Sequence, residues 1–378
     1  MTPPPRAILH IGAPKCGSSA LQMALSASPE LRGADGRRYA YLASHGRGVL
    51  RGGALSRAAR GAAHGYANWA NMARGADAET WWRRLEAAMR GSAARGVVPI
   101  LSSEGWIERG RAFGARPGLG DGAPVDAIAF VRPPLDWLNA AYWQWGVWHY
   151  GAFHNRNTED WLHRARFRLG RQVAAWAAVP AIRLRVLPAG QDVVAGFAGA
   201  CGLTLPPSGQ VNGAVPPALI GFLLRNRRFR PSPHASAVEF VFNRWCLVPG
   251  TPRPWAFLPR FAEAAWPALQ DEVSRLLDVL PEDEAGALLA DPGWRSLGPY
   301  YARLRAGPVP LDAPADMAGL LAALSDGLRR VAGALRMQPP APPQVPTARA
   351  PVADWDAAIA PVLAALVELD RLWRRGRG

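Results

Sequence analysis

The stretch AILHIGAPKCGSSALQ, residues 7–22, decides the fold. Its apolar start predicts a buried strand over residues 7–12, and the two serines open a helical pattern over residues 17–28. Gly12 and Gly17 bound the turn between these two elements. The stretch therefore predicts a strand, a tight loop and a helix in immediate succession.

The turn has the glycine spacing of a phosphate-binding loop, with one difference. In the ATPase pattern GxxxxGK[ST] a lysine follows the second glycine, whereas here Ser18 follows Gly17 and the lysine stands earlier, at position 15. Lys15 is the only lysine among 44 basic residues. A compact ammonium enters a tight backbone loop more easily than a planar guanidinium does. We therefore expect Lys15 to contact an anion, a phosphate or a sulfate, held by this loop.

Apolar runs and helical patterns alternate over the first half of the chain. Buried strands are also predicted over residues 97–103, 126–131 and 182–187. Helices are predicted over residues 17–28, 77–95, 134–149, 159–179 and 190–201. Residues 33–75 are expected to form loops and short helices, and the chain after residue 205 is expected to be largely helical. This alternation predicts an α/β fold, with a mainly parallel central sheet flanked by helices.

Three strand ends carry residues suited to one site. Gly12 ends the first predicted strand, Glu104 follows the second and Arg132 follows the third. Ligands of parallel sheets bind beyond these carboxyl ends, so we expect the three residues to meet. An ATPase needs an aspartate at such an end to hold Mg²⁺. Arg132 in this place favours a second anion and predicts no metal site.

The composition favours an anionic ligand. The chain has 44 Lys+Arg against 29 Asp+Glu, a formal net charge of +15, although a solvated arginine surface explains much of this equally well. Its three cysteines are too scattered for a disulfide framework or a zinc site. We find no secretory leader and no apolar run of about 18 residues, so the expected compartment is the cytoplasm.

The C-terminal region divides by composition. We expect an α/β domain over residues 1–310, a helical segment over 311–336, a proline-rich linker over 337–352 and a terminal amphipathic helix with a basic tail over 353–378. The apolar residues of the last helix at helical spacing are Trp355, Ile359, Val362, Leu366 and Leu369. Such a helix docks on its own domain, pairs with another copy or lies on an anionic membrane, and docking is the commonest outcome. The oligomeric state stays open.

Several motifs resemble those of one enzyme family. HIGAPKCGSSALQ (10–22) resembles the 5′-phosphosulfate loop of sulfotransferases that use 3′-phosphoadenosine 5′-phosphosulfate (PAPS), especially bacterial carbohydrate-type members. AIAFVRPPLDWLNAAY (127–142) resembles their 3′-phosphate motif, and VVPILSSEGW (97–106) resembles the strand between the two. The likeness covers residues 6–230. It implies a P-loop-like sulfotransferase fold and transfer of a sulfuryl group from PAPS to a hydroxyl acceptor, with a carbohydrate or glycolipid favoured.

The resemblance assigns roles to the matching positions. Lys15 would contact the bridging and sulfuryl oxygens of the donor, and Arg132 would bind its 3′ phosphate. The loop residues that would hold the 5′ phosphate are Pro14, Cys16, Gly17, Ser18 and Ser19. Where the family has a serine about two helical turns after the arginine, this chain has Asn139, which we expect to donate in its place. The product would be 3′,5′-adenosine bisphosphate, and no metal is required.

Glu104 is the expected general base. The strand before it often supplies the base in this superfamily, as a glutamate in several carbohydrate-acting relatives. The alternative is that Glu104 caps the next helix or pairs with an arginine. His64 and His45 lie in expected loops and are the reserve bases, although each alone is more often an ordinary surface residue. His10 is expected to be a hydrogen-bonded core residue.

An aromatic segment is the expected acceptor region. WLNAAYWQWGVWHYGAFHN (137–155) offers flat faces and polar tips to a sugar. Taken as one regular helix, it would bury Trp137 and Trp145 in the core. The residues expected to be open to an acceptor are Trp143, Trp148 and His149.

Two other classes of function remain open at this point. An atypical P-loop kinase or NTPase would bind ATP with Mg²⁺, although no lysine follows Gly17. A non-catalytic nucleotide-binding module would bind without transfer. No RNA-binding or zinc-finger pattern accompanies the arginines, so nucleic acid is not an expected partner.

Overall fold

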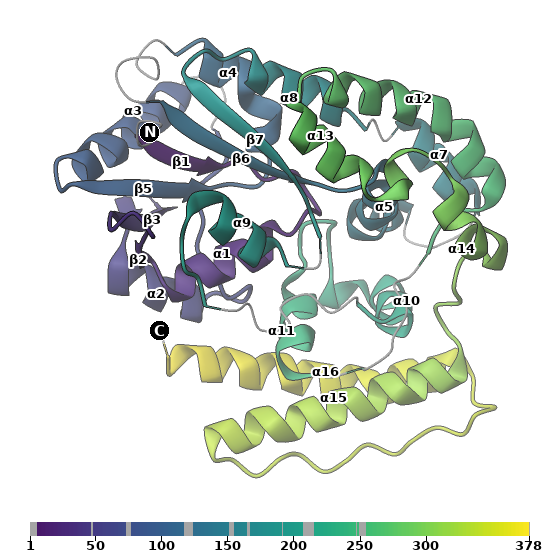
Figure 1. The fold of residues 1–378 in the computed structure, drawn as a ribbon. Helices are drawn as coiled ribbons and strands as arrows, with labels where there is room; N and C mark the ends of the chain where they lie inside the picture. The colour runs from purple at the N-terminus through teal and green to yellow at the C-terminus, as the bar shows by residue number, and fades with distance from the viewer. Residues whose placement is uncertain are drawn as a thin grey trace.

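The computed structural model describes most of the chain (Figure 1). The residues described are 6–46, 48–72, 77–116, 124–150, 155–164, 167–190, 192–206, 215–246, 248 and 255–377.

A mixed, mostly parallel sheet of seven strands forms the centre. Its order is β2 (Glu30–Arg32), β3 (Arg38–His45), β5 (Val97–Ser102), β1 (Ala7–His10), β6 (Val125–Val131) and β7 (Ile182–Pro188), with β4 (Gly48–Leu50) paired to β3. The strands from β3 to β7 along this order run parallel, whereas β2 and β4 pair antiparallel with β3. Every residue of β1 is buried, because helices cover both faces of the sheet. The predicted α/β class and mainly parallel sheet are confirmed.

The expectation for residues 33–75 was wrong in part, because the region holds strands beside the expected loops and short helix. Instead of loops and short helices alone, this region contains β3, β4 and part of the hairpin that joins β2 to β3. An Asp-Gly turn makes the hairpin: Gly36 has φ 78° and its N–H donates to the carbonyl of Gly33 at 2.9 Å. The parallel partner of β3 is β5, about sixty residues later, with Arg38 opposite Val97. Local composition does not reveal such a distant partner.

Helices cover the two faces of the sheet (Figure 1). One side carries α1 (Ser18–Ala27), α2 (Gly52–Gly61) and α9 (Val193–Cys201). The other side carries α3 (Asp77–Ala93), α4 (Gly110–Gly114) and α8 (Leu169–Ala177). The predicted helix over 159–179 is two helices, α7 (Asn155–Arg164) and α8.

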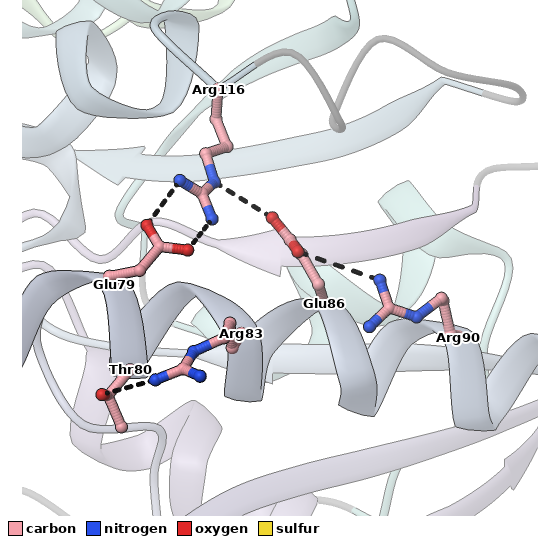
Figure 2. Close-up of polar contacts among 6 residues, drawn as sticks. All are labelled: Glu79, Thr80, Arg83, Glu86, Arg90 and Arg116. Atoms are coloured by element: carbon pink, nitrogen blue, oxygen red, sulfur yellow. Dashed lines mark hydrogen bonds and ion pairs between the residues drawn. The ribbon is translucent and has the colours of Figure 1, made fainter.

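Part of the arginine excess serves to join helices. Arg116, just after α4, donates to both carboxylate oxygens of Glu79 at 2.8 and 2.9 Å and to Glu86 at 3.0 Å (Figure 2). Both glutamates lie on α3, and Glu86 also faces Arg90 at 3.8 Å. This network accounts for some of the basic residues without any external anion.

The helix after β6 contains a local change of pitch. α5 (Pro134–Ala141) runs into η3 (Tyr142–Gly146), a π-helical segment, and then into α6 (Val147–Tyr150). A π-helix bonds each N–H to the carbonyl five residues earlier, so it rotates every later side chain relative to a regular α-helix.

The C-terminal half is helical. Its helices are α10 (Pro217–Arg225), α11 (Ala237–Trp245), α12 (Pro259–Leu277), α13 (Glu282–Leu289), α14 (Tyr301–Ala306), α15 (Pro314–Leu335) and α16 (Val352–Arg375). Short 3₁₀ turns also occur there, at η4 (Arg227–Phe229), η5 (Pro292–Trp294) and η6 (Gly298–Tyr300), and one, η1 (Trp106–Arg109), lies earlier, between β5 and α4. No helix among the described residues is both long and apolar enough to cross a membrane.

α15 and α16 lie side by side, joined by residues 336–351, which form neither helix nor strand (Figure 1). The buried apolar residues on α16 are Trp355, Ile359, Ala360, Val362, Leu363 and Leu366. α16 also packs on α11 and α2, so its apolar face docks on its own chain. Contact with an anionic membrane stays a prediction.

Candidate functional site

The loop between β1 and α1 has two residues in the left-handed region. Lys15 has φ 61° and Gly17 has φ 94°, and Gly17 directly precedes the helix. The N-cap residue Gly17 has no side chain that could cap the start of α1. Trp137 of α5 fixes the loop from outside, because its Nε1 donates to the carbonyl of Pro14 at 2.9 Å. The positive end of α1 therefore faces the space enclosed by the loop.

Gly12 is required by the close approach of Ser18. A Cβ at position 12 would lie 2.5 Å from Ser18 Oγ and 3.1 Å from His10 Cε1. Ser18 is buried, and its Oγ has no hydrogen-bond partner among the described residues. An orphaned buried hydroxyl costs free energy unless a ligand satisfies it. The loop thus fits an anion that would accept a hydrogen bond from Ser18.

Lys15 is held by a neutral partner. Its Nζ donates to Oε1 of Gln144, in η3, at 2.9 Å. Burial lowers the pKa of Lys15 to about 8; Glu104 opposes this effect, and Arg132 and Arg230 add to it. Within the part of the chain that the structure describes, no carboxylate forms an ion pair with this ammonium. Its charge is therefore available to an incoming anion.

Glu104 lies beside the loop. Beyond the sheet, the N–H of Ser103 donates to the carbonyl of His10 at 3.3 Å and that of Gly105 to the carbonyl of Gly12 at 3.0 Å, so β5 and β1 stay joined up to the site. Burial raises the pKa of Glu104, and the attraction of Lys15 opposes that shift. The alternative roles are not observed among the described residues: η1 has no side-chain cap and Glu104 has no arginine partner.

Arg132 reaches the loop from the end of β6. Burial raises the pKa of the Cys16 thiol to about 11, while the adjacent Arg132 guanidinium, which hydrogen-bonds it, acts in the opposite direction. Arg132 Nε is buried and has no hydrogen-bond partner among the described residues. The ends of β1, β5 and β6 thus bring Lys15, Glu104 and Arg132 to one edge of the sheet.

Asn139 has a structural contact. Its Oδ1 accepts a hydrogen bond from the N–H of Ala256 at 3.0 Å, and the residue is buried. This bond joins α5 to residues 255–258, the irregular segment before α12. A role for Asn139 in binding the 3′ phosphate stays a prediction.

The expected exposure of the tryptophans is reversed. Trp143 and Trp148 are buried and Trp137 and Trp145 are half-buried. The π-helical turn of η3 shifts the helical phase that the regular spacing assumed. Trp148 is covered by Arg230, whose guanidinium carbon lies 3.9 Å from the ring centre. His149 is exposed, as expected, and the acceptor role of all three predicted residues stays untested.

Three of the histidines named above, His10, His45 and His64, occupy different settings. His10 is buried, and its Nδ1 lies 2.7 Å from Ser102 Oγ; burial lowers its pKa to about 3, which confirms it as a core residue. His45 is exposed at the end of β3. The ring of His64 packs against Tyr66 at 4.2 Å, and burial lowers its pKa. Of the reserve bases, only His64 has a direct neighbour at the site.

Three site residues were missed by sequence reasoning: Gln144, Tyr66 and Arg230. The phenol of Tyr66 hydrogen-bonds Ser19 and lies within electrostatic range of Glu104. Arg230 is 2% exposed, pairs with Glu239 and donates to the carbonyl of Gln144 at 3.0 Å. No motif marks these residues, and only the arginine-rich run NRRFR (226–230) could have drawn attention to one of them.

A separate cavity of about 660 Å³ lies between α5, α7, α8 and α12. None of the loop residues lines it, and its Arg171 and Arg275 already face the buried Glu272, at 2.8 and 3.7 Å. The candidate site is therefore the loop between β1 and α1, and not this cavity. Among the described residues, no cluster of His, Cys, Asp or Glu could hold a metal ion.

Comparison with known proteins adds no relative. No family model, no curated protein and no solved structure matches this chain.

Proposed function

We propose that this protein is a sulfotransferase that moves a sulfuryl group from PAPS to a hydroxyl acceptor, on a P-loop-like sulfotransferase fold. The observation that carries the proposal is the loop itself. A buried Ser18 hydroxyl without a partner in the described structure and a lysine ammonium held only by an amide converge there. Arg132, which follows β6, adds a second cation at the same edge of the sheet.

The charge arrangement favours a donor with two anionic groups. Lys15 and Arg132 come from different strand ends, so each can bind a separate group of one nucleotide. A magnesium-dependent NTPase would need the lysine after Gly17, where Ser18 stands. The helix start of α1 and the hydroxyls of Ser18 and Ser19 suit the 5′ phosphate.

PAPS supplies an activated sulfuryl group whose transfer is an in-line displacement at sulfur. The bond from sulfur to the bridging oxygen breaks with its electron pair on that oxygen, and a bond to the acceptor oxygen forms. Lys15 stabilises the charge that develops on the bridging oxygen. Glu104 accepts the proton of the acceptor hydroxyl, a contribution of about 10²–10⁴ in rate. Arg132 binds the nucleotide's 3′ phosphate and is itself unchanged by the transfer.

The proposed acceptor is a class of molecules, the hydroxyl groups of carbohydrates and glycolipids. A carbohydrate or glycolipid hydroxyl fits an enzyme whose base is a carboxylate. Among the described aromatic and histidine side chains of the segment, His149 is exposed and Trp137 and Trp145 are half-buried. Screening sugars with labelled PAPS would identify the acceptor.

A thermal-shift titration with 3′,5′-adenosine bisphosphate, without metal, tests the donor assignment. At a hundredfold excess over Kd the nucleotide should stabilise the protein by about 2.7 kcal/mol. The Lys15→Met variant should lose most of this stabilisation. Arg90→Gln is the matched control, since it removes one positive charge from an exposed position on α3.

Two results would reject the proposal. One is the absence of any shift with the bisphosphate at saturating concentration. The other is a shift with ATP and Mg²⁺ that exceeds the shift with the bisphosphate, which would favour an atypical NTPase. Inorganic sulfate at the same ionic strength separates nucleotide recognition from simple anion binding.

A further inference from the structure

A buried carboxylate near the end of the chain has no part in the site described so far. Asp370 lies on α16 and is 0% exposed. It accepts hydrogen bonds from Arg244, from Trp245 Nε1 at 2.8 Å and from Arg374 Nε at 2.7 Å. A buried charge is costly even when paired, and apolar packing alone would hold a helix in place. The carboxylate therefore calls for another explanation.

The two arginines that bind Asp370 also bind one loop. Arg244 Nη2 donates to the carbonyl of Ala63 at 2.6 Å, and Arg374 Nη1 donates to the carbonyl of Gly61 at 2.6 Å. Both positive charges contribute to the lowered pKa of His64, after the larger effect of burial. Asp370 is thus joined to residues 61–66, the loop that follows α2, by two independent bridges.

That loop carries Tyr66 to the candidate site. Gly65, with φ 77°, packs so closely on α1 that a Cβ there would lie 3.3 Å from Met23 Sδ. On the other side, the rings of His64 and Tyr66 each lie 6.2 Å from that of Phe240 on α11. Held between α1 and α11, the loop presents the Tyr66 phenol to Ser19.

We propose that Asp370 is a positioning residue of the donor site: through Arg244 and Arg374 it holds loop 61–66 so that the Tyr66 phenol stays hydrogen-bonded to Ser19, beside Glu104. The terminal helix α16 is then part of the site and not an appendage. The effect on nucleotide binding rests on the proposed function, whereas the effect on Tyr66 does not.

Burial of Tyr66 explains why its position matters. Burial raises the pKa of the phenol, the bond to Ser19 lowers it and Glu104 raises it again, so that the phenol stays protonated at neutral pH. Because the bond to Ser19 lowers the pKa of the phenol, Ser19 donates in it and the phenol oxygen accepts, so Tyr66 fixes the orientation of the Ser19 hydroxyl beside the loop.

The test uses the full chain labelled with 3-fluorotyrosine. The sequence has seven tyrosines, and Tyr66→Phe identifies the fluorine signal of Tyr66. Asp370→Asn keeps the size of the side chain and removes its charge. We expect the Tyr66 signal to move, its pKa to fall toward that of free tyrosine, and the Kd for 3′,5′-adenosine bisphosphate to rise about tenfold, the effect of one lost hydrogen bond to a charged group.

Glu368→Gln is the matched control. Glu368 lies on the same helix and pairs with Arg371 at 2.6 Å, but its side chain is 52% exposed. This variant should leave the Tyr66 signal and the nucleotide affinity unchanged. Arg374→Gln is the second variant, since it removes one bridge while Arg244 and Trp245 still bind Asp370. It should shift the Tyr66 signal in the same direction by a smaller amount. If Asp370→Asn does not fold, this variant tests the proposed positioning role by itself.

A purely structural role predicts a different pattern. If Asp370 only anchors α16, the variants lower Tm and leave the Tyr66 signal and its titration at their wild-type values, and the inference is overturned. If wild type binds no bisphosphate, the proposed function fails, but the fluorine titration still decides whether the bridges hold Tyr66.

Discussion

The ammonium of Lys15 donates to the amide oxygen of Gln144 at 2.9 Å, across 129 positions of the chain. The partner is neutral, so it holds the ammonium in place and leaves its charge uncancelled. Gln144 itself is fixed by the bond from Arg230 to its carbonyl. This pair connects the loop after β1 to the π-helical turn η3, and it leads to the first two predictions.

Lys15 should titrate near pH 8, since burial lowers its pKa to about 8. The ammonium is present below that pH and is lost as the pH rises through it. Affinity for 3′,5′-adenosine bisphosphate should therefore be constant at neutral pH and fall above pH 8. Because Lys15 is the only lysine, reductive methylation with ¹³C-formaldehyde gives one lysine NMR signal, absent in Lys15→Met, whose titration reports this pKa. A midpoint above 10 would contradict the prediction.

Gln144→Glu should convert the neutral contact into an ion pair. A carboxylate at this distance should raise the pKa of Lys15 by about 1 to 3. It should also weaken bisphosphate binding by about tenfold, because the ammonium is already neutralised. Gln144→Met is the control for the loss of the hydrogen bond without added charge, and it should leave the pKa closer to the wild-type value. Equal nucleotide affinity in Gln144→Glu and wild type would show that Lys15 does not face the nucleotide.

Glu104→Gln should separate binding from transfer. The amide keeps the shape of the side chain but cannot accept a proton, so we expect transfer to fall by about 10²–10⁴ with the nucleotide Kd nearly unchanged. Burial raises the pKa of Glu104, and the active carboxylate form increases as the pH rises through that pKa. The acidic limb of the wild-type pH–rate profile should therefore disappear in the variant. Transfer at the wild-type rate would place the base elsewhere, with His64 as the nearest alternative.

Gly12→Ala should damage the loop by contact alone. The added methyl would lie 2.5 Å from Ser18 Oγ, and the neighbouring backbone of Glu104 limits relief. We expect a loss of about 1–3 kcal/mol in unfolding free energy and a weaker nucleotide-induced shift. Gly286→Ala is the control, because nothing lies within 4 Å of the corresponding methyl on α13. That variant should leave the unfolding free energy unchanged or raise it slightly. Denaturant unfolding of both variants and of wild type measures these changes.

Much of the candidate site was predictable because parallel sheets align their carboxyl ends. The strand, loop and helix over residues 7–28 are contiguous, so apolar spacing and two glycines suffice to predict them. Glu104 and Arg132 were predictable for the same reason, since each follows an apolar run that reads as a buried strand. The β2–β3 hairpin was missed although its Asp-Gly turn is a recognised signal, because β2 has only three residues, two of them charged, and so shows no apolar run.

The amino-acid sequence by itself determined the strand–loop–helix unit over residues 7–28, the polar residues that follow three of the strands and the uniqueness of Lys15, because these depend on neighbouring residues or on a simple count. Only the tertiary structure decided what surrounds them. Gln144 reaches Lys15 through a change of helical pitch, and Tyr66 reaches Ser19 because Asp370, more than three hundred positions away, secures its loop. Contacts between such distant residues arise from packing, which leaves no periodic trace along the chain.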